Sequence, residues 1–196
     1  MKNIGKLFLS ALVLVALFGC AHPISMKPNL NAIKAEGAVV IDKQVGYHIP
    51  DASIALEITS PGGGGDKVRY FPYRDMEAGF YKVLSEAFKG VTKVVNPKDS
   101  AEIAKSGVTL LITPEITTTS FSPSIVTWPP TVFTVTLNCV VVDAKGQKLT
   151  TVRVQGDGLA EFSEFKGNFS LSAVRASEDA LKKLMKALAD SKELRQ

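Results

Sequence analysis

Alternation of apolar and polar residues predicts a chain built largely from one-faced β-strands. Because successive strand side chains point to opposite faces, such a strand buries one face and leaves the other in solvent. In the clearest segment an apolar face alternates with threonine and asparagine, and that face consists of Phe133, Val135, Leu137, Cys139 and Val141. The six predicted strands cover residues 38–45, 53–59, 91–96, 108–121, 131–143 and 149–162. The apolar face of the last strand is predicted to carry Val152, Val154, Ala160 and Phe162. Pro114 interrupts the fourth strand, which predicts an edge position or a bulge there.

Apolar residues spaced three and four apart predict two amphipathic helices. The first is expected to be capped by Asp75 and to stop at Gly90, and the second to be capped by Ser170 or Ser172. One-faced strands and one-striped helices can bury their apolar surfaces only against each other. The pattern therefore predicts an α+β fold: a two-layer sandwich whose sheet is mainly antiparallel, with about 5–6 strands and two helices packed on one face.

The N-terminal end has the pattern of a secretory signal. Lys2 and Lys6 precede an uncharged apolar run over residues 7–19, which is shorter than the roughly 20 residues of a membrane-spanning helix. The sequence Leu-Phe-Gly-Cys that ends at Cys20 resembles a bacterial lipobox, in which the cysteine is modified by lipid. We therefore expect residues 1–19 to be a lipoprotein signal peptide; the alternative is an ordinary signal peptide in which Cys20 is incidental.

The lipobox resemblance implies a location. Cys20 would carry a diacylglyceryl thioether and an acylated amine, and several acyl chains anchor a protein durably. In such lipoproteins, an aspartate directly after the cysteine retains the protein in the inner membrane. Here that residue is Ala21, which favours the bacterial outer membrane, facing the periplasm. Residues 20–37 contain prolines and little periodicity, and we interpret them as the lipidated cysteine and a flexible tether. Residues 38–196 are then a single periplasmic domain.

Composition adds limits to the possible partners and chemistry. The formal charge of +4 falls to +2 when Lys2 and Lys6 are removed (4 − 2 = 2), and no basic stripe with interleaved aromatic residues is left, which argues against nucleic acid. Once Cys20 is lipidated, Cys139 has no partner within the chain for a disulfide. Its place on the apolar strand face predicts an inert core residue.

We find no motif for catalysis, a cofactor or a metal. Residues 62–65 are four glycines, but Asp66 and Val68 flank Lys67 where a phosphate-binding loop needs glycine and serine or threonine. The glycine run is therefore interpreted as a mobile loop. His22 and His48 belong to no cluster with metal-ligand spacing, and no nucleophile elbow occurs. We expect a protein without catalytic residues, cofactor or metal site.

One loop does not fit a purely solvated surface. Residues 120–133 carry Ile125, Val126 and the single tryptophan, Trp128, between prolines that stiffen the connection. Apolar residues on a loop either pack over the end of a sheet or form a contact site. Both interpretations remain open, and these three residues are the candidate interaction loop.

Several segments resemble the YajG-type outer-membrane lipoproteins, whose function is largely uncharacterised. They are a helix opened by Arg-Asp-Met and containing KVLSEAF, the strand GVTLLITPEI, the hairpin VVVDAKGQKLT with a return strand ending GLAEF, and a lysine-rich closing helix. The resemblance covers most of residues 38–190 and implies no catalytic residue. It favours a lipid-anchored protein that binds another envelope component, an envelope protein, in assembly or maintenance of the cell envelope. The alternative is a periplasmic carrier or sensor that binds a small apolar or glycan ligand between sheet and helices.

Overall fold

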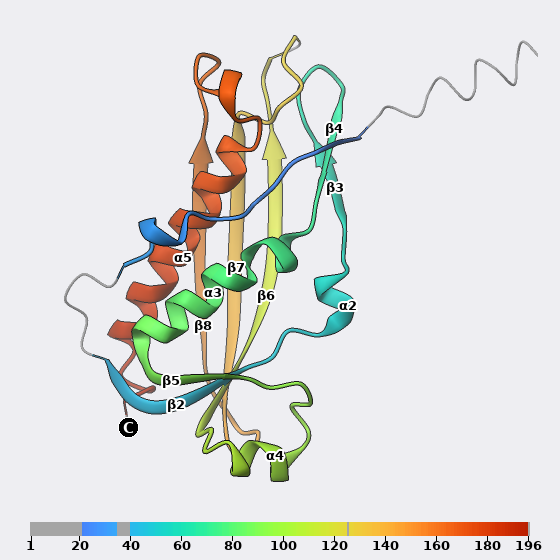
Figure 1. Ribbon diagram of the computed structural model, residues 1–196. Coiled ribbons are helices and arrows are strands. Elements are labelled where there is room, and N and C mark those ends of the chain that lie inside the picture. Colours follow the sequence, from blue (N-terminus) through green and yellow to red (C-terminus); the bar gives the residue numbers. More distant parts are fainter. Residues whose placement is uncertain (1–20, 35–39, 125, 196) are drawn as a thin grey trace, which may run out of the picture.

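The computed structural model describes residues 21–34, 40–124 and 126–195, which form two sheets and a helical layer. The larger sheet has the strand order β5 (Phe88–Lys93), β2 (Ile41–Tyr47), β6 (Leu110–Phe121), β7 (Val132–Asp143) and β8 (Lys148–Leu159). The smaller sheet has the order β1 (Ala21–Pro23), β4 (Lys67–Tyr70) and β3 (Ile58–Pro61). Two long helices, α3 (Pro72–Ala87) and α5 (Leu171–Asp190), lie on one face of the larger sheet (Figure 1). The short helices are α2 (Asp51–Ile54), α4 (Ser100–Lys105), η1 (Leu30–Ala32) and η2 (Phe165–Gly167).

The predicted two-layer α+β sandwich is confirmed, with two differences in the strands. The described residues form eight strands instead of 5–6, and the larger sheet is mixed instead of mainly antiparallel. β2 pairs in parallel with both β5 and β6, whereas β6, β7 and β8 form an antiparallel meander. The physical reason is that α3 lies in the connection between β2 and β5, and a helical crossover returns the chain in the same direction.

Two element boundaries were predicted wrongly because tertiary contacts decide them. α3 begins at Pro72, so Asp75 lies within its first turn, and the helix ends at Ala87. Gly90 does not stop the helix but lies inside β5, where the side chain of Gln44 fills the space that a Cβ would need. The predicted strand over residues 53–59 is also wrong in its first part, because the chain forms α2 there and β3 starts only at Ile58.

The predicted faces of the central strands are mostly confirmed. Phe133, Val135, Leu137, Cys139 and Val141 are all at most 1% exposed. Pro114 pairs with Cys139 without a bulge, and it is tolerated because β2 last bonds β6 at Ile112, through the N–H of His48. Phe162 is an exception, since it was expected on the buried face and is 67% exposed.

α5 lies directly on the backbone of β8. A Cβ added to Gly156 would come within 2.2 Å of the Ala180 nitrogen, and one added to Gly158 within 1.9 Å of the Ser172 carbonyl oxygen. No side chain fits in that space, so glycine on the strand permits the close contact. The residues of α5 on this side are correspondingly small, and include Ala173, Ala176 and Ala180, all 0% exposed.

The prediction of a flexible tether is wrong for residues 21–34. β1 pairs in parallel with β4, and Ile24, Met26 and Ile33 are buried in the main core. The Met26 N–H donates to the Asp75 carboxylate (2.9 Å), and the Ser25 hydroxyl donates to the same oxygen (3.3 Å). These contacts fix the segment to the start of α3, so residues 21–34 are part of the folded domain. Cys20 and residues 1–19 lie outside the described residues.

We expect Asp75→Ala to detach this segment. The substitution leaves the buried Met26 N–H without its acceptor, which costs about 1–3 kcal/mol, and the amides of Ile24 and Met26 should exchange faster with solvent. Hydrogen exchange and denaturant unfolding measure the two effects. Asp75→Asn, which keeps an acceptor oxygen, should change less, and Asp190→Ala at an exposed site is the control. Unchanged exchange at Met26 would show that the carboxylate does not hold the segment.

Candidate functional site

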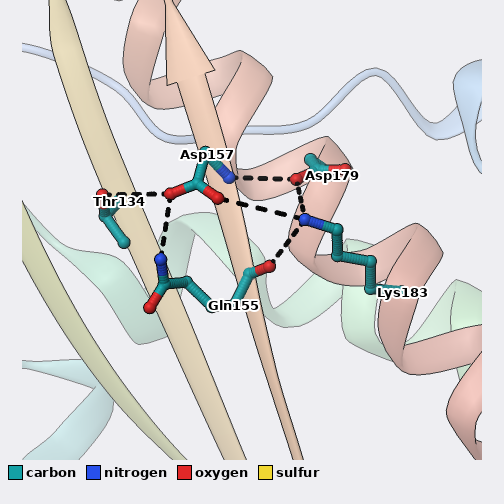
Figure 2. Close-up of polar contacts among 5 residues, drawn as sticks. All are labelled: Thr134, Gln155, Asp157, Asp179 and Lys183. Carbon is teal, nitrogen blue, oxygen red and sulfur yellow. Dashed lines mark hydrogen bonds and ion pairs between the residues drawn. The ribbon is translucent and has the colours of Figure 1, made fainter.

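A cluster of charged side chains beside β8 satisfies backbone groups of that strand instead of forming a reactive site. Lys183 donates to the Gln155 carbonyl (2.9 Å) and to Asp179 (2.7 Å), and Asp179 accepts the Asp157 N–H (3.0 Å), as Figure 2 shows. One turn earlier on α5, Arg175 donates to the Leu159 carbonyl (2.7 Å). Side chains four residues apart on α5 thus bond alternate residues of the outer edge of β8. They protect this part of the edge from pairing with another strand.

The described residues offer little for catalysis or metal binding. Among them, no group of three or more His, Cys, Asp or Glu side chains could hold a metal ion. Cys139 is buried, and desolvation raises the pKa of its thiol to about 12, so it is not a nucleophile at neutral pH. Within the same part of the chain, no helix has the length and apolar character needed to cross a bilayer.

Three connections meet at one end of the larger sheet, which we call the loop end. They are the β3–β4 turn (62–66), the β6–β7 loop (122–131) and the β8–α5 connection (160–170), which gather at the top of Figure 1. The pairing of Ala21 with Lys67 brings the start of β1 to the same end. The candidate interaction loop predicted from the sequence therefore lies near the first described residues of the chain.

The glycine run, expected to be mobile, is bound to the β6–β7 loop. The Gly63 N–H donates to the Trp128 carbonyl (2.9 Å), and the Gly64 N–H donates to the Ser124 carbonyl (3.0 Å). A Cβ on Gly63 would lie 1.8 Å from the Thr127 carbonyl oxygen, so only glycine permits this approach. Gly64 has a φ of +66°, in the left-handed region. The mobile-loop prediction is wrong because the two loops share these hydrogen bonds.

The β6–β7 loop is also ordered by its own hydroxyl groups and by α5. Ser124 donates to the Thr127 hydroxyl (2.8 Å), and Thr127 and Ser122 are each 8% exposed. The hydroxyl of Ser172, in the first turn of α5, donates to the Pro130 carbonyl (2.6 Å). The loop is therefore fixed to both the β3–β4 turn and the helical layer.

The candidate loop residues have different environments. Trp128 is partly buried, and its ring stacks on His22 (centroids 4.2 Å apart, 25° between planes) and tilts against Phe169 (4.9 Å, 49°). His22 also lies 3.4 Å from the Asp66 carboxylate. Val126 is 87% exposed, and Ile125 lies outside the described residues. Trp128 thus packs on the domain, whereas Val126 is free to contact a partner.

Apolar side chains surround a cleft between the β6–β7 loop and the β8–α5 connection. The cleft has a volume of about 450 Å³ and is bordered by Val126, Leu159 and Phe162, with Phe165 and Thr131 among the other lining residues. The Thr131 hydroxyl is buried and has no hydrogen-bond partner among the described residues. Sequence reasoning missed the cleft because Phe162 was assigned to a strand interior.

An ion pair holds the β8–α5 connection in place. Arg175 donates to both carboxylate oxygens of Glu164 (3.0 and 2.6 Å) as well as to the Leu159 carbonyl. The guanidinium group of Arg175 and the Glu161 N–H lower the pKa of Glu164 to about 2. Glu164 is therefore charged throughout the physiological pH range, and the connection keeps its anchor on α5.

Comparison with known proteins gives a likeness of fold. No family model matches the chain, and no curated protein is similar in sequence. Protein XCC0632 from Xanthomonas campestris, of the family DUF330, has a TM-score of 0.50 with 11% identity, covering 88% of this chain and 91% of that chain. The PelC dodecamer from Paraburkholderia phytofirmans has a TM-score of 0.39 with 12% identity, covering 77% of this chain and 95% of that one. A neuraminyllactose-binding hemagglutinin homologue from Helicobacter pylori has a TM-score of 0.43 with 11% identity, covering 82% and 91%. The first likeness concerns the fold alone, and the other two are too weak to support an argument.

We expect Trp128→Ala to destabilise the protein, whereas truncation of an exposed loop residue would change the stability little. The ring loses its contacts with His22 and Phe169, and because it is only partly buried the cost should be about 2–3 kcal/mol, below the ~3–5 kcal/mol of a fully buried aromatic. Denaturant unfolding followed by circular dichroism measures it. Val126→Ala should leave the midpoint unchanged, since that side chain is exposed. Equal midpoints for both variants would mean that Trp128 does not hold the loop end together.

Proposed function

We propose that this protein is a non-catalytic bacterial lipoprotein of the outer membrane, anchored by lipid at Cys20, whose periplasmic domain binds another envelope component. The sequence observation behind the proposal is the lipobox-like Leu-Phe-Gly-Cys that ends at Cys20, and the structural observation is the place of Ala21. The residue directly after Cys20 is already part of a sheet, beside Lys67 at the loop end. The resemblance of the sequence to a lipobox and to the YajG-type lipoproteins supports the same assignment.

The packing of residues 21–34 changes how such an anchor would act. A flexible tether of this length would let the domain move some distance from the membrane. Instead, His22 stacks on Trp128 and lies beside Asp66, so very little chain separates Cys20 from the folded domain. An anchor at this place holds the domain close to the bilayer, with a defined end toward it.

The anchor predicts the mass of the mature protein. Wild-type protein from the membrane fraction should begin at Cys20 and carry the mass of a diacylglyceryl group and an amide-linked acyl chain. Cys20→Ser should lack both and leave the membrane fraction, because the thioether cannot form. Intact-mass spectrometry and membrane fractionation measure the two outcomes.

The control for this experiment is Cys139→Ala, which keeps the lipobox cysteine and should stay acylated. An unmodified Cys20 in the wild-type protein would refute the anchored function. Isolation of a stoichiometric envelope protein with the wild-type chain would support the binding part of the proposal.

The cleft favours a second candidate function, a carrier or sensor. Its volume of about 450 Å³ is within the range of about 300–1,000 Å³ typical of small-molecule sites. The cleft is not between sheet and helices, where the sequence predicted a ligand. Residues there, such as Leu137, Leu181 and Leu184, are at most 1% exposed and fill the core. A ligand would instead lie at the end of the sheet.

Thermal unfolding tests the second candidate. A ligand at about 100 times its Kd adds about 2.7 kcal/mol to stability and raises the unfolding midpoint. Laurate serves as an apolar probe and maltotriose as a glycan probe. A cleft ligand should lose its effect in Phe162→Asp and keep it in Val95→Asp, an exposed site in a different part of the chain. No shift with either probe would count against the carrier function for these ligand classes.

A further inference from the structure

We propose that the loop end lies directly against the lipid bilayer, with the side chains of Val126, Leu159 and Phe162 in the lipid interface. The inference rests on the proposed lipid anchor and adds a second, non-covalent membrane contact made by the domain itself. The occupant of this surface is lipid, and a protein partner is an alternative outcome of the test.

Exposed apolar side chains concentrate at the loop end. Eleven large hydrophobic residues of the described chain are exposed, and five of them belong to this end: Phe121 (57%), Val126 (87%), Leu159 (63%), Phe162 (67%) and Phe169 (50%). Three of these border or adjoin one cleft. Apolar groups gathered in this way mark a contact surface, whereas single exposed residues elsewhere need no such explanation.

The position of the first described residues, directly after Cys20, points to lipid as the contact. Residues 7–19 form an uncharged apolar run that ends immediately before Cys20. The described chain starts at Ala21, paired with Lys67 next to the β3–β4 turn. That turn is bonded to the β6–β7 loop through Gly63 and Gly64. Whatever attaches residue 20 to a membrane therefore brings the exposed apolar side chains to the same membrane.

The loop end is also rigid enough to present these side chains without a large ordering cost. Trp128 is held between His22 and Phe169, and the β8–α5 connection is held by the ion pair of Glu164 with Arg175. Val126 and Phe162 project from these fixed connections. Phenylalanine and leucine side chains on a surface segment bind a bilayer by burying apolar area at the boundary of headgroups and acyl chains.

The charges at this end favour apolar insertion over attraction to anionic lipid. Asp66 lies beside His22, and Glu164 is paired with Arg175. Lys67 and Glu161 are exposed and opposite in sign. Among the described side chains the loop end thus has no cluster of basic residues of the kind that binds acidic headgroups. Its membrane contact should therefore be insensitive to salt, which screens charge but not apolar burial.

Labelling at a single engineered cysteine tests the inference. The full-length acylated protein is reconstituted into vesicles of neutral phosphatidylcholine, with an environment-sensitive dye at Val126→Cys or, as control, at Val95→Cys, which is 74% exposed between β5 and α4. Cys139 is buried and should take no label. We expect the dye at 126 to be quenched by a spin-labelled lipid and protected from iodide, and the dye at 95 to show the reverse.

A second variant separates insertion from mere proximity. Phe162→Asp in the protein labelled at 126 should reduce quenching by the spin-labelled lipid and restore quenching by iodide, whereas Val95→Asp should change neither. Raising the salt concentration should leave the quenching unchanged. Both variants keep Cys20, so the protein should still float with the vesicles.

The outcomes distinguish this inference from the proposed function. A dye at 126 that stays in water while the acylated protein floats with vesicles overturns the inference and leaves the anchor intact. Protection at 126 only in native outer-membrane fragments, and not in vesicles, overturns it in favour of a protein partner. An unacylated protein whose dye at 126 still enters the bilayer would refute the anchored function and support the membrane contact.

Discussion

The carboxylate of Asp75, 5% exposed at the start of α3, holds residues 21–34, the first described segment of the chain, on the domain. By accepting the Met26 N–H it fixes a segment that carries two prolines and has no periodic pattern of its own. β1 can then pair with β4, and His22 can stack on Trp128. The relation between the proposed anchor and the loop end depends on this buried interaction.

The loop end is rigid because main-chain groups of two loops bond each other directly there. A close main-chain contact also joins the two layers of the fold. Gly63 lets the β3–β4 turn bond directly to the Trp128 carbonyl, and Gly156 lets α5 rest on β8. In both places a Cβ would meet main-chain atoms, which cannot move aside as a flexible side chain can. The glycines thus give close contact between elements far apart in the sequence.

The sequence predicted those features that depend on local periodicity. The apolar face of β7 follows from alternation alone, and the stripe of α5 from helical spacing. The features that it missed depend on partners distant in the chain. Residues 21–34 look like a tether in the sequence because their order comes from Asp75 and β4. Residues 62–65 look like a mobile loop because their hydrogen-bond acceptors lie on the β6–β7 loop. Alternation predicts Phe162 on a buried face, and this prediction fails because β8 ends at Leu159.

If lipid occupies the loop end, an envelope partner needs a different surface, and the face of the larger sheet opposite α3 and α5 is the candidate. α3 and α5 cover only one face of that sheet (Figure 1). On the other face β7 carries Thr134, Thr136 and Asn138, each half-buried, and Asn138 bonds Glu115 of the neighbouring strand. The middle of this face is polar and built on antiparallel ladders, whereas Ile103 of α4 lies in an apolar cluster with Leu111 and Val142 at one end. A partner there would be recognised by hydrogen bonds to fixed hydroxyl and amide groups, whereas the membrane contact depends on apolar burial, so the two contacts can form independently.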